Sequence, residues 1–154
     1  MHVRSNLLTT RTTIVTVEAP QRLAFVDLTP ELEALLAADG SEEGFVIAFS
    51  RHTTCALLIN ELEDGVQDDL RTRLDHLFPP SSYYAHDDLT IRTQNLQPGE
   101  RANGHAHVAQ MLMGGTSQTI PFAGGELLLG RWQRLLLVEL DEPKPRELVF
   151  QVHG

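Results

Sequence analysis

Apolar residues recur along this chain in short runs that predict strands. Residues 11–18 and 22–28 are rich in β-branched and apolar side chains, and we expect them to pair as a hairpin. Residues 44–51 and 55–60 are almost continuously apolar. Such runs are typical of buried strands, and the first of them is expected to be central, with both faces covered.

Three other segments carry helical signals. Residues 29–40 begin with threonine, proline and glutamate and end at glycine, as helices commonly do. Residues 62–77 repeat a leucine or valine every four positions, with charged residues between them. Residues 103–113 begin at an asparagine and end before two glycines. Residues 78–103 are irregular, and an irregular segment of this length within a compact domain is often functional.

The C-terminal part returns to strand patterns. Four runs, at residues 116–122, 126–130, 133–141 and 146–152, are separated by glycine- or proline-containing turns. The chain therefore combines many short strands with about three helices, without regular strand–helix alternation. This combination predicts an α+β fold, with a largely antiparallel sheet covered by helices, in a single domain over residues 1–154.

One stretch, from His52 to Glu61, has chemical groups at both ends of an apolar run. Fully extended, the stretch would span about 30 Å at ~3.3 Å per residue. The two side chains therefore meet only if the strand bends, or if neighbouring subunits bring opposite ends together.

The composition limits which binding partners and which cellular compartment we expect for this protein. The 154 residues include 21 acidic and 12 basic ones, for a formal charge of -9, which argues against nonspecific binding to nucleic acid or anionic membranes. We find no apolar run long enough for a membrane span and no signal peptide, so a cytoplasmic protein is expected. The single cysteine, Cys55, lies in an apolar run and is expected to be a buried thiol, with a catalytic thiol as the alternative.

Four of the seven histidines, His52, His86, His105 and His107, lie at element boundaries. Imidazole suits zinc and similar ions, although this spacing matches no known closed metal site.

The last two histidines are two positions apart, so on a helix they point roughly 200° apart and only one faces inward. Met111 and Leu112 indicate the buried side, and His107 shares the face of Met111. His107 is therefore the better site candidate; the alternative is a core histidine satisfied by hydrogen bonds.

Two further segments admit either a binding or a structural interpretation. The run from Gly114 to Gln118 offers free amides and hydroxyls for a phosphate, or simply ends a helix. Trp132 and Gln133 begin a strand, where the indole forms either an aromatic wall for a flat ring or part of the core.

Several short motifs resemble those of the YjbQ-like family, often labelled secondary thiamine-phosphate synthase. Their order and spacing agree over nearly the whole chain. They are His52-Thr53-Thr54-Cys55-Ala56-Leu57-Leu58-Ile59-Asn60-Glu61, Tyr84-Ala85-His86-Asp87, Asn103-Gly104-His105-Ala106-His107, Leu112-Met113-Gly114-Gly115-Thr116-Ser117 and Gly130-Arg131-Trp132-Gln133. The sequence departs from the family pattern at Arg131, usually threonine, and at Gly104, usually alanine.

The resemblance implies a barrel-like sheet, a homotrimer and a polar pocket at subunit boundaries. It places His52, His86 and His107 near an anion or a divalent metal such as zinc or magnesium. It also implies a thiamine-phosphate synthase-type activity, which joins a pyrimidine diphosphate to a thiazole phosphate.

The resemblance and the residue types together suggest roles for the motif residues. Glu61 and His107 are the catalytic candidates, although Glu61 or Asn60 could instead cap the following helix. The candidates for substrate binding are Thr53, Asn60, Gly115, Thr116, Ser117, Trp132 and Gln133. Two alternative functions stay open: a metal-dependent hydrolase of phosphate esters, and a non-catalytic trimeric module that binds an anion.

Overall fold

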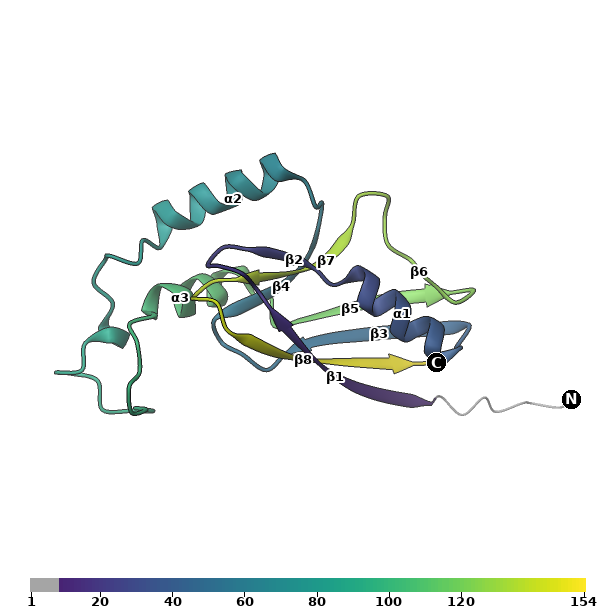
Figure 1. Ribbon diagram of the computed structural model, residues 1–154, viewed down its shortest axis with the longest axis horizontal. Coiled ribbons are helices and arrows are strands. Elements are labelled where there is room, and N and C mark those ends of the chain that lie inside the picture. Colours follow the sequence, from purple (N-terminus) through teal and green to yellow (C-terminus); the bar gives the residue numbers. More distant parts are fainter. Residues whose placement is uncertain (1–8) are drawn as a thin grey trace, which may run out of the picture.

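The computed structural model describes residues 9–154. The expectation that the chain does not begin with a signal peptide concerns residues outside this range. Within residues 9–154, eight strands, three α-helices and one short 3-10 helix follow one another (Figure 1). In order they are β1 (Thr10–Glu18), β2 (Phe25–Asp27), α1 (Thr29–Asp39), β3 (Glu43–Ser50), β4 (Cys55–Asn60), α2 (Asp64–Leu77), η1 (Ala85–Asp87), α3 (Gly104–Met113), β5 (Ser117–Ala123), β6 (Glu126–Leu127), β7 (Arg134–Glu139) and β8 (Pro145–His153).

The strands form two antiparallel sheets that together make a half-barrel. One sheet has the order β1-β8-β3-β5-β6, and the other has the order β2-β7-β4. The sheets meet where β4 and β5 approach each other: the Leu57 amide donates to the Gly115 carbonyl at 2.6 Å, and the Gln118 side chain donates to the Leu57 carbonyl at 2.8 Å. The predicted α+β class, with an antiparallel sheet and three helices, is therefore confirmed.

The expected hairpin between the first two strands is wrong. β1 pairs along its whole length with β8, from Thr10 opposite His153 to Glu18 opposite Pro145. β2 pairs with β7 in the other sheet. The two nine-residue strands at the ends of the chain match each other in length, whereas the three-residue β2 offers β1 few partners.

The main core lies inside the half-barrel, where α1 contributes Leu32 and Leu36. β3 is the central strand of the larger sheet, as predicted, but within one chain it is not covered on both faces, because its outward-facing Phe45 and Phe49 are exposed. The strands buried on both faces are β4 and β7: Leu57 enters the main core, and its neighbours enter a second core formed with α2 and α3.

α2 packs less tightly than its apolar repeat predicts. Leu74 is buried, but Val66 and Leu77 are exposed, and Leu62 precedes the helix. Figure 1 shows α2 along the outside of the molecule. The predicted stripe is therefore only partly covered within one chain.

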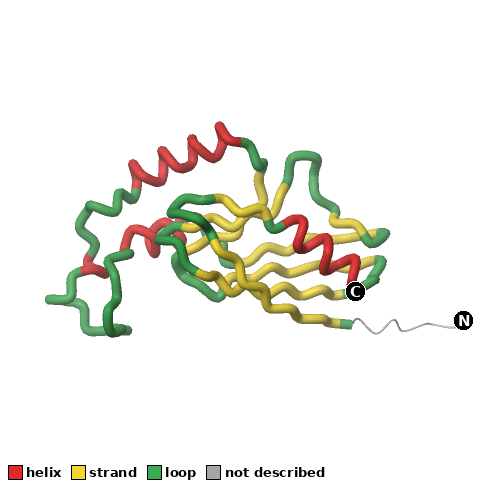
Figure 2. Tube along the Cα trace, in the orientation of Figure 1, coloured by secondary structure: helices red, strands yellow, loops and turns green. Residues whose placement is uncertain are grey.

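The irregular segment between α2 and α3 is broken only by η1 (Figure 2). It lies with α3 at one end of the molecule, whereas the start of β1 and the C-terminus lie at the other end (Figure 1). Among residues 9–154, no helix has the length and apolar character needed to cross a membrane.

Candidate functional site

Two histidines that are far apart in the sequence face each other in a cavity at the α3 end. The ring centroids of His86 and His107 lie 4.5 Å apart, with an angle of 33° between the planes. The cavity has a volume of about 500 Å³ and opens to solvent. It is lined by Thr53, His86, Arg92, Gln94, Asn95, Glu100 and His107.

The irregular segment and α3 bring these two rings together. His86 lies in η1, whereas His107 lies in the first turn of α3, where its amide donates to the Asn103 carbonyl at 3.3 Å. Asn103 occupies the N-cap position but makes no capping bond with its side chain. The Asp87 carboxylate takes that role, because its Oδ1 accepts from the Asn103 amide at 3.0 Å and from the Gly104 amide at 2.9 Å.

Arg92 and Glu100 complete one wall of the cavity, and sequence reasoning missed both. The Arg92 guanidinium donates to Glu100 at 2.7 Å and to the His86 carbonyl at 2.9 Å, and it also reaches the carbonyls of Gln94 and Asn95. Arg92 therefore holds the irregular segment in its conformation. The only signal in the sequence was an opposite-charge pair within a segment without periodicity.

The environment of His107 favours its neutral form. Burial lowers the pKa of its imidazole, and the nearby His86 lowers this pKa further. At neutral pH the ring is therefore unprotonated, so it can offer a lone pair to a cation or to a proton.

His52, the third expected member of the set, is engaged elsewhere. Its Nε2 accepts a hydrogen bond from the Glu147 amide of β8 at 2.8 Å, so that its lone pair is occupied. Burial lowers the pKa of His52, and so does the charge of Arg146. Within residues 9–154, no three His, Cys, Asp or Glu side chains are grouped as a metal site. A metal held by all three histidines thus stays a prediction, and two of the three are brought together.

The predicted inward side of α3 is wrong. Met111 is 78 % exposed and Leu112 is exposed as well, whereas His105, which was expected to face outward, is only 6 % exposed. Ala106 and Ala109 form the contact with the second core. His107 is half-buried at the edge of this contact, and that position is what lets it reach the cavity.

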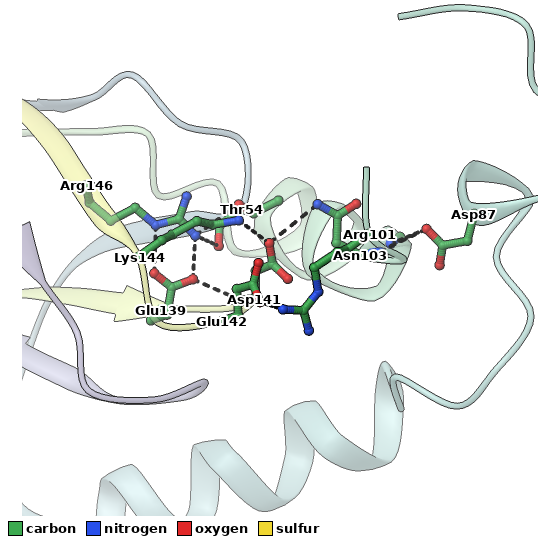
Figure 3. Close-up of polar contacts among 10 residues, drawn as sticks. Thr54, Asp87, Arg101, Asn103, Glu139, Asp141, Glu142, Lys144 and Arg146 are labelled. Atoms are coloured by element: carbon green, nitrogen blue, oxygen red, sulfur yellow. Dashed lines mark hydrogen bonds and ion pairs between the residues drawn. The ribbon is translucent and has the colours of Figure 1, made fainter. Parts of the chain in front are cut away.

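A buried ion pair between Arg146 and Glu139 contacts Thr54, the neighbour in sequence of the cavity residue Thr53 (Figure 3). Arg146 Nε donates to Glu139 Oε2 at 2.7 Å, and a second guanidinium nitrogen bonds to Glu139 Oε1. That nitrogen also donates to the carbonyl and the hydroxyl of Thr54, at 3.1 and 3.0 Å. The pair therefore fixes the bend that carries Thr53 into the cavity.

Glu61 and Trp132 line a different cavity, of about 430 Å³, at the far end of β4. Trp132 is exposed, and the Arg131 guanidinium lies 4.6 Å above its ring. The capping alternative for Glu61 and Asn60 is wrong, because Glu63 accepts from the Gly65 and Val66 amides, both at 2.8 Å. His52 and Glu61 thus remain at opposite ends of β4 within one chain.

The remaining candidates for substrate binding already have partners within the chain. The Gly115 carbonyl bonds to β4, and a Cβ at this position would lie 2.6 Å from the Leu57 carbonyl oxygen. The Thr116 hydroxyl accepts from Gln110 at 2.9 Å, and Ser117 begins β5. Gln133 accepts from the Gly130 amide at 2.7 Å. These contacts give the segments structural roles, whether or not a ligand also binds there.

Cys55 is fully buried and lies 3.3 Å from the Ser50 hydroxyl. Burial raises the pKa of its thiol, which disfavours the reactive thiolate. The buried-thiol interpretation is therefore confirmed.

Known proteins resemble this chain over nearly its whole length. A family model described as UPF0047 protein YjbQ-like matches residues 2–154. A UPF0047 protein of Archaeoglobus fulgidus is 33 % identical over 137 residues, which cover 89 % of this chain and 97 % of that protein.

Solved structures agree with the sequence matches. A YbjQ-like protein of unknown function from Sulfolobus solfataricus has a TM-score of 0.81 and 27 % identity, covering 96 % of this chain and 99 % of the other. A hypothetical protein from Aeropyrum pernix has a TM-score of 0.76 and 30 % identity, covering 94 % of this chain and 98 % of the other.

Proposed function

Since the chain belongs to the YjbQ-like UPF0047 family, we propose that it is an enzyme acting on a small phosphorylated substrate at the His86–His107 cavity. The observation that carries the proposal is the pair of imidazoles 4.5 Å apart in a polar cavity that is open to solvent. Two such rings can hold a cation or donate to phosphate oxygens. The specific reaction that we propose is of the thiamine-phosphate synthase type.

In this reaction the thiazole nitrogen attacks the methylene carbon of the pyrimidine substrate. A carbon–nitrogen bond forms while the carbon–oxygen bond breaks, and the departing diphosphate takes the electron pair. The protein needs to align the two substrates and to stabilise the negative charge that develops on the leaving group. His86 and His107 would supply this charge stabilisation by holding a cation, with Thr53 as a further contact.

The charge balance of the cavity favours a bound cation. Arg92 is paired with Glu100 at 2.7 Å, so it contributes little uncompensated positive charge. A divalent ion on His86 and His107 would supply that charge, and imidazole ligands favour zinc over magnesium, which prefers oxygen. Because His52 Nε2 is occupied by the Glu147 amide, further ligands would have to come from water, from the substrate or from another chain.

The test is a turnover assay with the purified chain, both thiamine precursors and added zinc or magnesium, followed by a panel of phosphomonoesters and diphosphates. Joined product with the precursors supports the proposed transferase. Hydrolysis of the panel without joined product would instead establish the phosphate-ester hydrolase. Tight binding of phosphate without turnover of any compound would identify a non-catalytic anion-binding module, and the enzyme proposal would be abandoned.

A homotrimer is part of the same proposal, and the open face of the larger sheet is the surface that we assign to it. Ile14 and Phe49 both pair with Val149 across β8, so the three side chains lie in one row on the same face. Ile14 is 57 % exposed and Phe49 is 41 % exposed. An uncovered apolar row of this kind is typical of a surface buried by association.

Phe49→Asp is expected to convert the trimer to a monomer, because the new charge would have to be buried without a partner. Light scattering coupled to size exclusion measures the mass directly. Ala34→Asp, which adds the same charge on the exposed side of α1, should leave the trimer intact. A Phe49→Asp protein that keeps the mass of the unchanged protein would mean that this face is not the interface.

A further inference from the structure

The Asp87 carboxylate contacts both the ring of His86 and the start of the helix that carries His107. Its Oδ1 accepts from the Asn103 amide at 3.0 Å and from the Gly104 amide at 2.9 Å, and it lies 3.2 Å from His86 Nδ1. The carboxylate is mostly buried, with 17 % of the side chain exposed. Figure 3 shows it reaching across to the start of α3. One oxygen atom therefore contacts the ring of His86 and the helix that carries His107.

A second group competes for His86 Nδ1, namely the Arg92 guanidinium at 3.3 Å. The guanidinium nitrogen involved carries two hydrogens. Two nearer acceptors use them: Glu100 Oε1 at 2.7 Å and the His86 carbonyl at 2.9 Å. Nδ1 is therefore free to carry its own hydrogen and to donate it to Asp87. In a neutral imidazole this leaves Nε2 as the unprotonated atom.

The same carboxylate oxygen determines where α3 begins. The first amides of a helix have no partner within the helix and need an outside acceptor. The Asn103 side chain does not provide one, because it points toward Asp141, with its amide nitrogen 3.4 Å from that carboxylate (Figure 3). A Cβ at Gly104 would lie 2.5 Å from the Tyr84 Cβ and 3.1 Å from the second Asp87 oxygen, so glycine permits the close approach of this segment.

We propose that Asp87 is a positioning residue, which through Oδ1 orients His86 with its Nε2 lone pair available to a ligand and sets the start of the helix that presents His107. The proposal rests on the proposed function only in taking the His86–His107 cavity as the site. It assigns Asp87 no contact with substrate. It makes the unprotonated Nε2 of His86 the atom that would bind a cation or accept a proton.

The test is long-range nitrogen-15 NMR of the neutral imidazoles, recorded at alkaline pH, with the His86 signals assigned by their loss in His86→Gln. In the unchanged protein we expect His86 to be protonated at Nδ1, with Nε2 in the range of an unprotonated ring nitrogen. Asp87→Ala removes the acceptor for Nδ1 and leaves the Arg92 guanidinium beside it, at 3.3 Å. The expected result is a reversed tautomer, protonated at Nε2. In Asp87→Asn the amide oxygen can take the place of Oδ1 and accept from Nδ1, Asn103 and Gly104, so this variant should fold and keep the original tautomer.

Asp88→Ala is the matched control, because the carboxylate of Asp88 bonds to Tyr83 and Thr90 and to neither histidine of the cavity. This variant should keep the original tautomer. An Nε2-protonated His86 in the unchanged protein would assign Nδ1 to Arg92 and overturn the proposal, even if Asp87→Ala failed to fold. An unchanged tautomer in folded Asp87→Ala would overturn it as well. Because the readout needs no substrate, absence of turnover would count against the proposed function and not against this proposal.

Discussion

Arg146→Met is expected to lower the free energy of unfolding by about 3–5 kcal/mol, the usual cost of leaving one partner of a buried ion pair alone. Arg146 is 2 % exposed and Glu139 is 0 % exposed. Without the guanidinium, the Glu139 carboxylate keeps one hydrogen bond within the described residues, from the Asp141 amide at 3.0 Å. The carbonyl and hydroxyl of Thr54 lose a donor in the same step.

Urea unfolding of single and double variants separates the cost of burying an unpaired charge from the other effects of losing Arg146. Adding Glu139→Gln to Arg146→Met should recover much of the lost stability, since the double variant no longer buries an unpaired carboxylate. Arg51→Met removes an exposed pair with Glu147, in which both side chains are more than half exposed, and it should cost no more than about 1 kcal/mol. An equally small cost for Arg146→Met would contradict the prediction that this buried pair is needed for stability.

His107→Ala is expected to reduce turnover of the phosphorylated substrate by about 100-fold to 1,000-fold, as expected for loss of one group that stabilises transition-state charge. The ring is half-buried at the edge of α3, and alanine is a strong helix former. The variant should therefore fold. Circular dichroism and the midpoint of thermal unfolding would verify this before kinetics are compared.

His76→Ala is the matched control, because this histidine is exposed on α2 and does not line the cavity. Its kinetics should equal those of the unchanged protein. If His107→Ala lowers only kcat, the imidazole stabilises the transition state. If it changes only KM, the imidazole contributes equally to binding of the substrate and of the transition state. Unchanged kcat and KM in a folded His107→Ala protein would remove His107 from the proposed site.

The sequence predicted most of the elements because their signals are local. The alternation in β1 and β8, the apolar run of β4 and the helix-ending glycines of α1 and α3 each depend on neighbouring residues alone. The motifs also selected His86 and His107, whose rings the structure brings together in one cavity. Those predictions needed no knowledge of which segments meet.

Other features failed because they depend on partners that are distant in sequence. The pairing of β1 depends on β8, at the other end of the chain. The inward side of α3 depends on which face meets the second core, and the small Ala106 and Ala109 make that contact in place of Met111. Arg92 and Asp87 gave no periodic signal, because their partners are carbonyls and amides of an irregular segment.

In the stretch from His52 to Glu61, too, some features followed from the sequence and others from the tertiary structure. The sequence by itself determined that a buried strand separates two chemical ends, because an extended apolar run fixes the distance between them. Only the tertiary structure decided what each end contacts: His52 bonds to the Glu147 amide, Thr53 lines the histidine cavity, and Glu61 lines another cavity with Trp132. The physical reason is that a strand specifies its own length and faces, whereas the partners at its ends are set by how the two sheets and α3 pack around it.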